Sequence, residues 1–95
     1  MPYYVYLLES KQDKTLYSGQ TDNLIDRFQK HNKKLVRSTK SRAPYDLVYF
    51  EVHNTRSEAM WREWEIKKKW NIERKRKLIE SFDKSKIIKL FTDGA

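Results

Sequence analysis

The chain has 95 residues, of which 38% are hydrophobic and 14% aromatic, enough for one compact domain with a modest core. It has no cysteine, which excludes disulfides, thiolate zinc sites and a cysteine nucleophile. With no long apolar run and no signal-like start, we expect neither a membrane span nor export. The same absences make the cytoplasm the expected location. Lys and Arg number 21 against 13 Asp and Glu, and this net charge of +8 favours nucleic acid as partner.

The N-terminal half predicts a β-hairpin followed by a helix. Residues 3–9 form an unbroken apolar run and residues 15–19 a second one, which together predict a hairpin whose first strand is central in the sheet. Thr21 or Asp22 is the expected N-cap of a helix that runs to about residue 33. Its expected buried face carries Leu24, Ile25, Phe28 and Leu35. The cation-rich residues 33–44 contain no acid and predict a mobile basic loop.

The C-terminal half predicts a strand and two further helices. "YDLVYFEV", residues 45–52, reads as a strand, and "TRSE", residues 55–58, matches a capping box that opens a helix over residues 56–69. "NIERKRKLIESF", residues 71–82, predicts a third helix. The order ββαβαα predicts an α+β fold, a small three-stranded antiparallel sheet with flanking helices. We expect residues 1–82 to form the domain and residues 83–95 a short helix or an edge strand with a disordered tail.

One carboxylate falls on the apolar side of the second predicted helix. At about 100° per residue, Glu63 lies inside an arc that holds Ala59, Met60, Trp64, Ile66 and Trp70. A carboxylate that faces the core is costly unless it is paired or binds a cation. Glu63 therefore needs a partner, either an arginine or tyrosine of the protein or a bound metal ion, and its position alone leaves both alternatives open.

Further polar groups gather near the same sheet. Arg27 and His31 are four residues apart and lie on one face of the first helix, although each alone is more often structural than catalytic. Tyr6 and Tyr17 are expected to pair across the hairpin. Together with Glu63 these groups suit phosphodiester cleavage, because the carboxylate can hold a divalent cation, the guanidinium can neutralise phosphate charge, and a phenol or imidazole can transfer a proton.

The ordered set of these residues resembles the GIY-YIG nuclease family, which includes the N-terminal cleavage domain of an excinuclease and small standalone bacterial proteins. "YVY", residues 4–6, and "YSG", residues 17–19, stand at the two halves of the family signature. Arg27 matches the family arginine, His31 the tyrosine or histidine one turn later, and Glu63 the glutamate that holds the metal. The resemblance covers residues 3 to about 82.

The resemblance implies hydrolysis with one divalent cation, Mg²⁺ or Mn²⁺, bound by Glu63. Tyr17 would act as general base on the attacking water, and Tyr6 would help to order water and phosphate. Arg27 would stabilise the pentavalent phosphate, and His31 would either orient a proton-transfer group or serve as one.

The expected function is a metal-dependent endonuclease that acts on structured or damaged DNA in repair or recombination. Two departures from the family pattern, Tyr4 at the first signature glycine and Gln20 where excinuclease-type members often carry lysine, support an alternative, a non-catalytic nucleic-acid-binding module that retains the fold. A small basic ribosome- or RNA-associated protein would explain the charge, but it would leave Glu63 unexplained.

Two groups of cations are candidate contacts to the nucleic-acid backbone: Lys33, Lys34, Arg37, Lys40 and Arg42 in the loop, and Arg74, Lys75, Arg76 and Lys77 on the third helix. Contacts to phosphate predict recognition of a structure such as a flap, branch, nick or single strand. Large members of the family attach a separate DNA-recognition domain; here substrate choice is expected from the module itself, a homodimer or a partner protein. Trp61, on the solvent side, is expected to stack on a base or, in preference, to contact the C-terminal segment.

Overall fold

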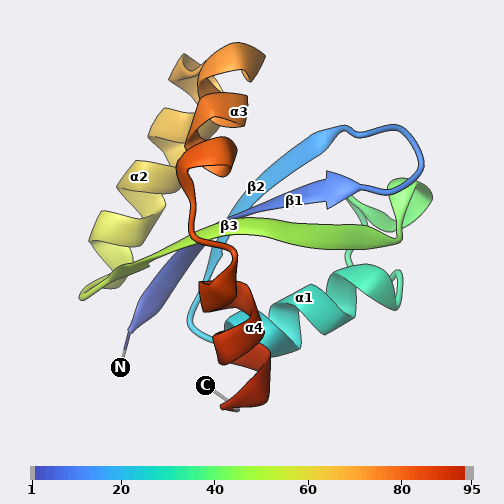
Figure 1. The fold of residues 1–95 in the computed structure, drawn as a ribbon, viewed down its shortest axis with the longest axis horizontal. Helices are drawn as coiled ribbons and strands as arrows, with labels where there is room; N and C mark the ends of the chain where they lie inside the picture. Colours follow the sequence, from blue (N-terminus) through green and yellow to red (C-terminus); the bar gives the residue numbers. More distant parts are fainter. Residues whose placement is uncertain (1, 94–95) are drawn as a thin grey trace.

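A computed structural model describes residues 2–93 of the protein. Within them, β1 (Tyr3–Ser10), β2 (Leu16–Thr21) and β3 (Tyr45–His53) form an antiparallel sheet in the order β2-β1-β3. The helices are α1 (Leu24–Asn32), the short 3₁₀ helix η1 (Lys40–Arg42), α2 (Arg56–Lys69), α3 (Ile72–Ser81) and α4 (Ser85–Thr92) (Figure 1). The predicted α+β fold with a central first strand is confirmed, and α4 extends the predicted order.

The central strand β1 supplies a hydrophobic core to each face of the sheet. Alternate side chains of a strand point to opposite faces, so Val5 and Leu7 pack toward α2 and α3, whereas Tyr6 and Leu8 pack toward α1 and α4. Figure 1 shows the same division, with α2 and α3 on one side of the sheet and α1 and α4 on the other. β1 is therefore buried on both faces, which explains its unbroken apolar run.

The ends of the helices follow from local capping. The side chain of Asn23 accepts a hydrogen bond from the Asp26 amide at 3.1 Å and caps α1, so the prediction of Thr21 or Asp22 as N-cap is wrong. Leu35 is exposed, contrary to prediction, because α1 ends at Asn32. For α2 the predicted bounds are confirmed, and the Thr55 side chain accepts from the Glu58 amide at 3.2 Å.

The basic segment between α1 and β3 is packed against the body of the protein, which corrects the prediction of a mobile loop. Val36, Thr39 and Ala43 are buried between the exposed cations. The Tyr45 hydroxyl donates to the Thr39 carbonyl at 3.2 Å, and the Ser10 hydroxyl donates to the Arg42 carbonyl at 2.6 Å. The segment is therefore held at the end of β1, and its Ala43 joins the core on the α1 side of the sheet.

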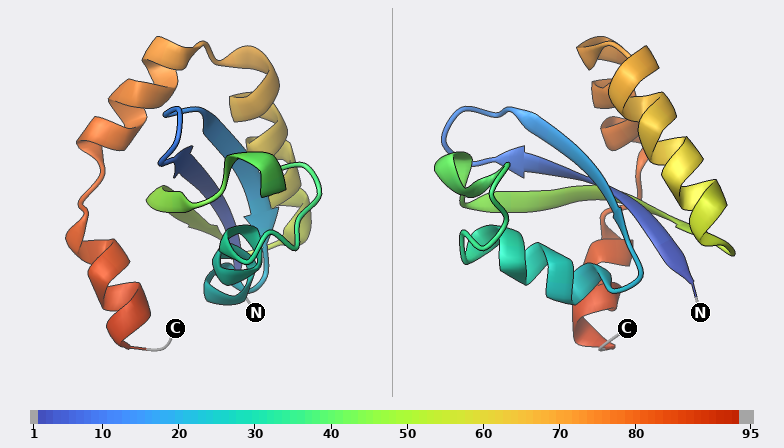
Figure 2. Two further views of the ribbon diagram at one scale, coloured as in Figure 1. Left: turned by 90° about the vertical axis from the view of Figure 1, so that its right-hand side faces the viewer. Right: turned by 180° about the vertical axis from the view of Figure 1, so that it is seen from behind.

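The C-terminal segment forms a helix, the first of the two predicted alternatives. Leu90 of α4 is buried in the core on the α1 side of the sheet, and the rings of Phe91 and Phe28 meet edge to face with centroids 5.6 Å apart. Figure 2 shows α4 beside α1 at the end of the chain. The predicted disordered tail concerns residues 94–95, which lie outside the described residues. No helix within residues 2–93 has the length and apolar character that crossing a membrane requires.

Candidate active site

The candidate residues come together around the open edge of β2, between α1 and α2. β2 is an edge strand, so side chains from both faces of the sheet meet beside it. Tyr17 points to the α1 side, where it packs against the core that holds Tyr6, whereas Gln20 lines a hollow with residues of α2. The site is thus assembled from the hairpin and the two helices that flank its outer strand.

Gly19 leaves the space that the Tyr6 ring occupies. Tyr6 lies opposite Gly19 in the register, and a Cβ atom added at Gly19 would lie 2.5 Å from Tyr6 Cζ and closer still to the hydroxyl. Tyr17 lies opposite Leu8, so the two tyrosines are diagonal neighbours with ring centroids 6.5 Å apart, which corrects the expectation of a direct pair. Glycine in the "YSG" motif is therefore a packing requirement of Tyr6.

His31 is fully buried in a cage of tyrosine rings. Its ring centroid lies 5.1 Å from that of Tyr17, 5.8 Å from that of Tyr6 and 6.2 Å from that of Tyr45. Burial lowers the pKa of His31 to about 4, and the nearby positive charge of Arg27 contributes in the same sense. The imidazole is therefore neutral near pH 7.

A chain of hydrogen bonds fixes the tautomer of this imidazole. The Thr39 hydroxyl donates to the Val36 carbonyl at 3.4 Å, so its oxygen is free to accept from Nδ1–H of His31 at 2.8 Å. Nε2 of the neutral ring then carries a lone pair and accepts the Tyr6 hydroxyl proton at 2.9 Å. Thr39 thereby orients the rings of His31 and Tyr6. The sequence did not single it out, because its only signal there is a hydroxyl between apolar positions of a basic segment.

Tyr6 is a buried phenol that keeps its proton. It is 1% exposed, and burial raises its pKa to about 12, with a further rise from Tyr17 and a smaller one from the Glu63 carboxylate, against the lowering effect of Arg27. These influences show that Arg27, Tyr17 and Glu63 all lie within electrostatic reach of the Tyr6 hydroxyl. The structure thus brings the five predicted site residues into one neighbourhood, with Tyr6 and His31 inside the protein.

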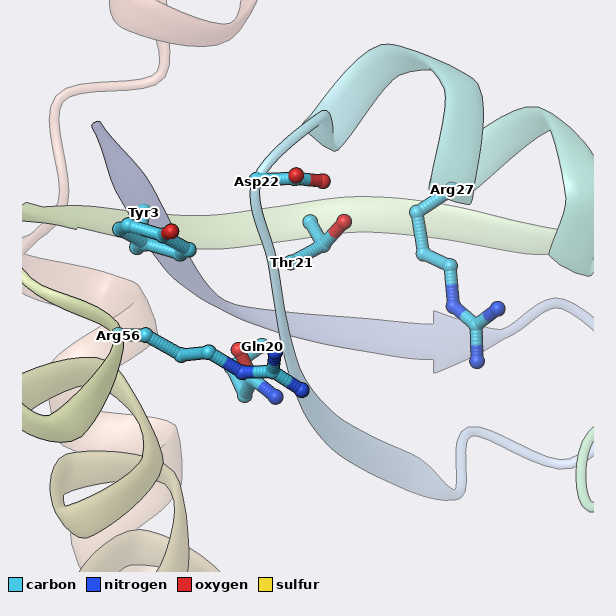
Figure 3. A pocket seen from close by; sticks show the side chains of 6 residues that line it. All are labelled: Tyr3, Gln20, Thr21, Asp22, Arg27 and Arg56. Atoms are coloured by element: carbon cyan, nitrogen blue, oxygen red, sulfur yellow. The ribbon is translucent and has the colours of Figure 1, made fainter. Parts of the chain in front are cut away.

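Arg27 opens onto a pocket of about 260 Å³ at one end of this neighbourhood. The pocket is lined by Tyr3, Gln20, Thr21, Asp22, Arg27 and Arg56. Figure 3 shows Arg56 reaching from the start of α2 to Gln20, whereas Arg27 extends from α1 on the other side of β2. An anion with several oxygens, such as a phosphate, fits a pocket with two such cations.

Glu63 lies at the edge of the buried stripe of α2, half-buried rather than in the core. It lines a hollow of about 290 Å³ with Gln20, Met60, Trp64, Lys67 and Lys68. Among residues 2–93, no ion pair or side-chain hydrogen bond reaches its carboxylate. Within the described residues Glu63 therefore has neither the arginine nor the tyrosine partner that the sequence pattern allowed, and its carboxylate is half-buried at the hollow rather than enclosed in the core.

Three of the nine predicted nucleic-acid contacts have partners within the protein. Arg76 pairs with Glu9 and donates to the Lys14 carbonyl at 2.7 Å, Arg74 lies 3.9 Å from the Trp70 ring centroid, and Arg42 donates to Thr15 at 3.0 Å. The others are Lys33, Lys34, Arg37, Lys40, Lys75 and Lys77. The sequence did not single out three further cations that line the two hollows, Arg56, Lys67 and Lys68. Only the fold shows that the first and the last turn of α2 both lie beside β2.

Within the described residues, Trp61 does not contact the C-terminal segment, the preferred one of its two expected partners. Its ring stacks on that of Trp64 of the same helix, with centroids 5.1 Å apart and planes inclined by 22°, and it is 64% exposed. The C-terminal helix α4 packs on the other face of the sheet, which corrects the expected contact between Trp61 and that segment.

The structure thus combines a hairpin, a helix carrying Arg27 and His31, and a second helix carrying Glu63. Comparison with known proteins shows that this is a domain of a nuclease superfamily and identifies the family. The chain belongs to the GIY-YIG family, whose model, described as the GIY-YIG catalytic domain, matches residues 2–89. This is a nuclease superfamily, so the predicted resemblance is confirmed.

Within the family, the chain is similar to small proteins named UPF0213. It is 44% identical over 79 residues to one from Staphylococcus haemolyticus, covering 82% of this chain and 94% of the relative, and 40% identical over 79 residues to one from Haloquadratum walsbyi, covering 82% and 86%. The solution NMR structure of a UPF0213 protein from Bacillus halodurans matches with a TM-score of 0.54 and 34% identity over 84% of each chain. These names state no activity.

Proposed function

We propose that this protein is an endonuclease that hydrolyses phosphodiester bonds in structured or damaged DNA, with one Mg²⁺ or Mn²⁺ ion held by Glu63, and that it serves repair or recombination. The observation that carries the proposal is the state of the Glu63 carboxylate. Its carboxylate has no ion pair within the described residues although Lys67 and Lys68 line the same hollow, and it lies within electrostatic reach of the buried Tyr6.

The donor set beside β2 suits a hard cation that is shared with the substrate. Mg²⁺ commonly binds one or two protein carboxylates and takes its other ligands from waters and substrate phosphates. Glu63 supplies a carboxylate and Gln20 an amide oxygen to the same hollow. Residues 2–93 contain no group of three or more His, Cys, Asp or Glu side chains that could enclose a metal. When bound, the cation would stabilise the negative charge that develops on the phosphate.

Arg27 and Tyr17 are the groups placed to act on the phosphate and on water. The Arg27 guanidinium lines the pocket that adjoins the Glu63 hollow through Gln20, so a phosphate at this junction could receive hydrogen bonds from it as charge develops. Tyr17 is only partly buried, unlike Tyr6, so its hydroxyl can release its proton to solvent. Its Oη would then be free to take the proton of the attacking water as general base.

Tyr6 and His31 orient other side chains of the site and do not themselves meet the substrate. Both are buried, and the hydrogen bonds from Tyr6 to His31 and from His31 to Thr39 hold the two rings behind Tyr17. Of the two roles expected for His31, this arrangement supports orientation of a proton-transfer group. It also supports Tyr6 as a residue that positions Tyr17 and the Arg27 guanidinium, because its ring lies 6.5 Å from that of Tyr17 and its hydroxyl lies within electrostatic reach of Arg27.

The substrate backbone would follow the cations beside β2. Arg56 at the start of α2 and Lys67 and Lys68 in its last turns lie at the two ends of the site, and the exposed lysines of the segment after α1 extend the positive surface. Contacts of this kind recognise phosphates rather than base edges, so they select DNA by structure. A second copy of the chain or a partner protein would add selectivity.

Cleavage of a DNA panel with a matched pair of variants tests the proposal. Labelled linear, nicked, flapped, branched and single-stranded DNAs are incubated with Mg²⁺ or Mn²⁺ and the wild type, Glu63→Gln or Glu80→Gln. The control Glu80 is an exposed carboxylate of α3 outside both hollows. We expect cleavage by the wild type and the control that chelator abolishes, and none by Glu63→Gln. If the wild type binds these DNAs but cuts none of them, the protein is instead a non-catalytic binding module.

A further inference from the structure

The outer face of α2 exposes a pair of stacked tryptophans that the proposed chemistry does not use. Trp61 is 64% exposed and Trp64 41%, and both line an apolar hollow of about 350 Å³ with Ser57 and Met60. Tryptophan is usually largely buried, so two indole rings that stack on each other in solvent form a recognisable binding surface.

This surface is continuous with the candidate active site. Met60 and Trp64 line both the tryptophan hollow and the hollow that holds Glu63. Because Trp64 lines the hollow that holds Glu63, its ring lies at the edge of the place where the scissile phosphate is proposed to bind, and Trp61 stacks on that ring. A group attached to that phosphate can reach the tryptophans without leaving the surface.

The charges around the tryptophans indicate the chemistry of what they bind. Lys67 and Lys68 border the shared hollow, and the Lys69 ammonium lies 5.2 Å from the centroid of the Trp64 ring. Planar aromatic faces beside lysines match a nucleic-acid strand, whose bases stack and whose phosphates pair with cations. A protein partner would need a larger apolar area than this small hollow rimmed by lysines.

We propose that the Trp61–Trp64 pair is a stacking platform for an unpaired base next to the scissile phosphate, which makes DNA with a single-stranded segment at the cleavage position the substrate class. The proposal rests on the proposed function for the position of the scissile phosphate. Bases within a duplex cannot place their faces on an indole ring, so the platform selects single strands, flaps and splayed ends over intact duplex.

Binding measured without metal tests the platform separately from catalysis. A fluorescein-labelled oligothymidine and a labelled duplex of equal length are titrated in chelator with the wild type, Trp61→Ala, Trp61→Phe and Ile88→Ala, and affinity is read from anisotropy. Ile88 is an exposed apolar residue of α4 and controls for loss of apolar surface. We expect Trp61→Ala to weaken single-strand binding about tenfold with little effect on duplex binding, Trp61→Phe to retain most of it, and Ile88→Ala to match the wild type.

Three results would overturn the platform. They are unchanged single-strand affinity in Trp61→Ala, an equal loss for single strand and duplex, and a wild type that sediments as a dimer which Trp61→Ala makes monomeric. Circular dichroism verifies that the variants are folded. If the platform binds as expected while the wild type cleaves no DNA, the endonuclease proposal fails and the stacking site stands, so the two proposals fail in distinguishable ways.

Discussion

The buried, neutral His31 makes a quantitative prediction about stability at acid pH. In the folded protein its pKa lies at about 4, whereas its ordinary value is 6.5. Between these two values the unfolded chain holds a proton on this imidazole that the folded protein does not, so the free energy of unfolding rises with pH across this window. The contribution of His31 is complete above about pH 6.5 and is lost as the pH falls toward 4.

The size of the effect follows from the same two values. Each pH unit between them is worth about 1.4 kcal/mol, so the full difference is about 3 kcal/mol and about 2 kcal/mol of it is lost near pH 4.5. A His31→Gln variant keeps a side chain that can accept the Tyr6 hydroxyl proton but cannot titrate. The variant should therefore be destabilised near pH 7, and the gap between it and the wild type should narrow by about 2 kcal/mol near pH 4.5.

Urea unfolding followed by tryptophan fluorescence measures both proteins at the two pH values. All other ionisable groups are common to the two proteins, so their effects cancel in the comparison. The reasoning is refuted if the difference in free energy of unfolding is the same at both pH values, or if the His31 ring resonance titrates near its ordinary pKa in NMR spectra.

Three further perturbations address the packing, the hydrogen bonds and the charges of the site. Gly19→Ala should displace the Tyr6 ring and cost about 1–3 kcal/mol in thermal unfolding, and unchanged stability would contradict the close contact. Thr39→Val should leave a buried imidazole N–H without an acceptor and cost about 1–3 kcal/mol, which Thr39→Ser should largely restore; equal stability of both variants would count against it. Replacing Lys67 and Lys68 together by alanine should reduce the slope of log affinity for DNA against log salt by about 1.5, and a slope equal to that of the wild type would remove both from the interface.

The sequence predicted best what local patterns determine. The capping residue Thr55 and the apolar spacing around Ile66 set the bounds of α2, and the turn between two apolar runs set the hairpin. The N-cap of α1 was missed because Thr21, Asp22 and Asn23 all favour that position, and the final choice depends on how β2 ends.

What the sequence could not predict depends on contacts between distant segments. Thr39 meets His31 only because the segment after α1 folds back over the sheet, and the buried residues that cause this are separated by cations that suggest a loop. Arg56, Lys67 and Lys68 look like an ordinary charged helix face until β2 is placed beside α2. The helical position of Glu63 was enough to single it out in the sequence. Only the structure shows that its carboxylate has no ion pair within the described residues.

The position of a bound paramagnetic ion shows directly whether Glu63 holds the metal of the site. Mn²⁺ is titrated into ¹⁵N-labelled wild type and Glu63→Gln in the presence of a short single-stranded oligonucleotide, and the broadening of amide resonances locates the ion. We expect the amide resonances of residues around Glu63 and Gln20 to broaden first in the wild type. In Glu63→Gln, these resonances should no longer broaden before the others. Broadening centred elsewhere, or the same pattern in Glu63→Gln, would contradict it.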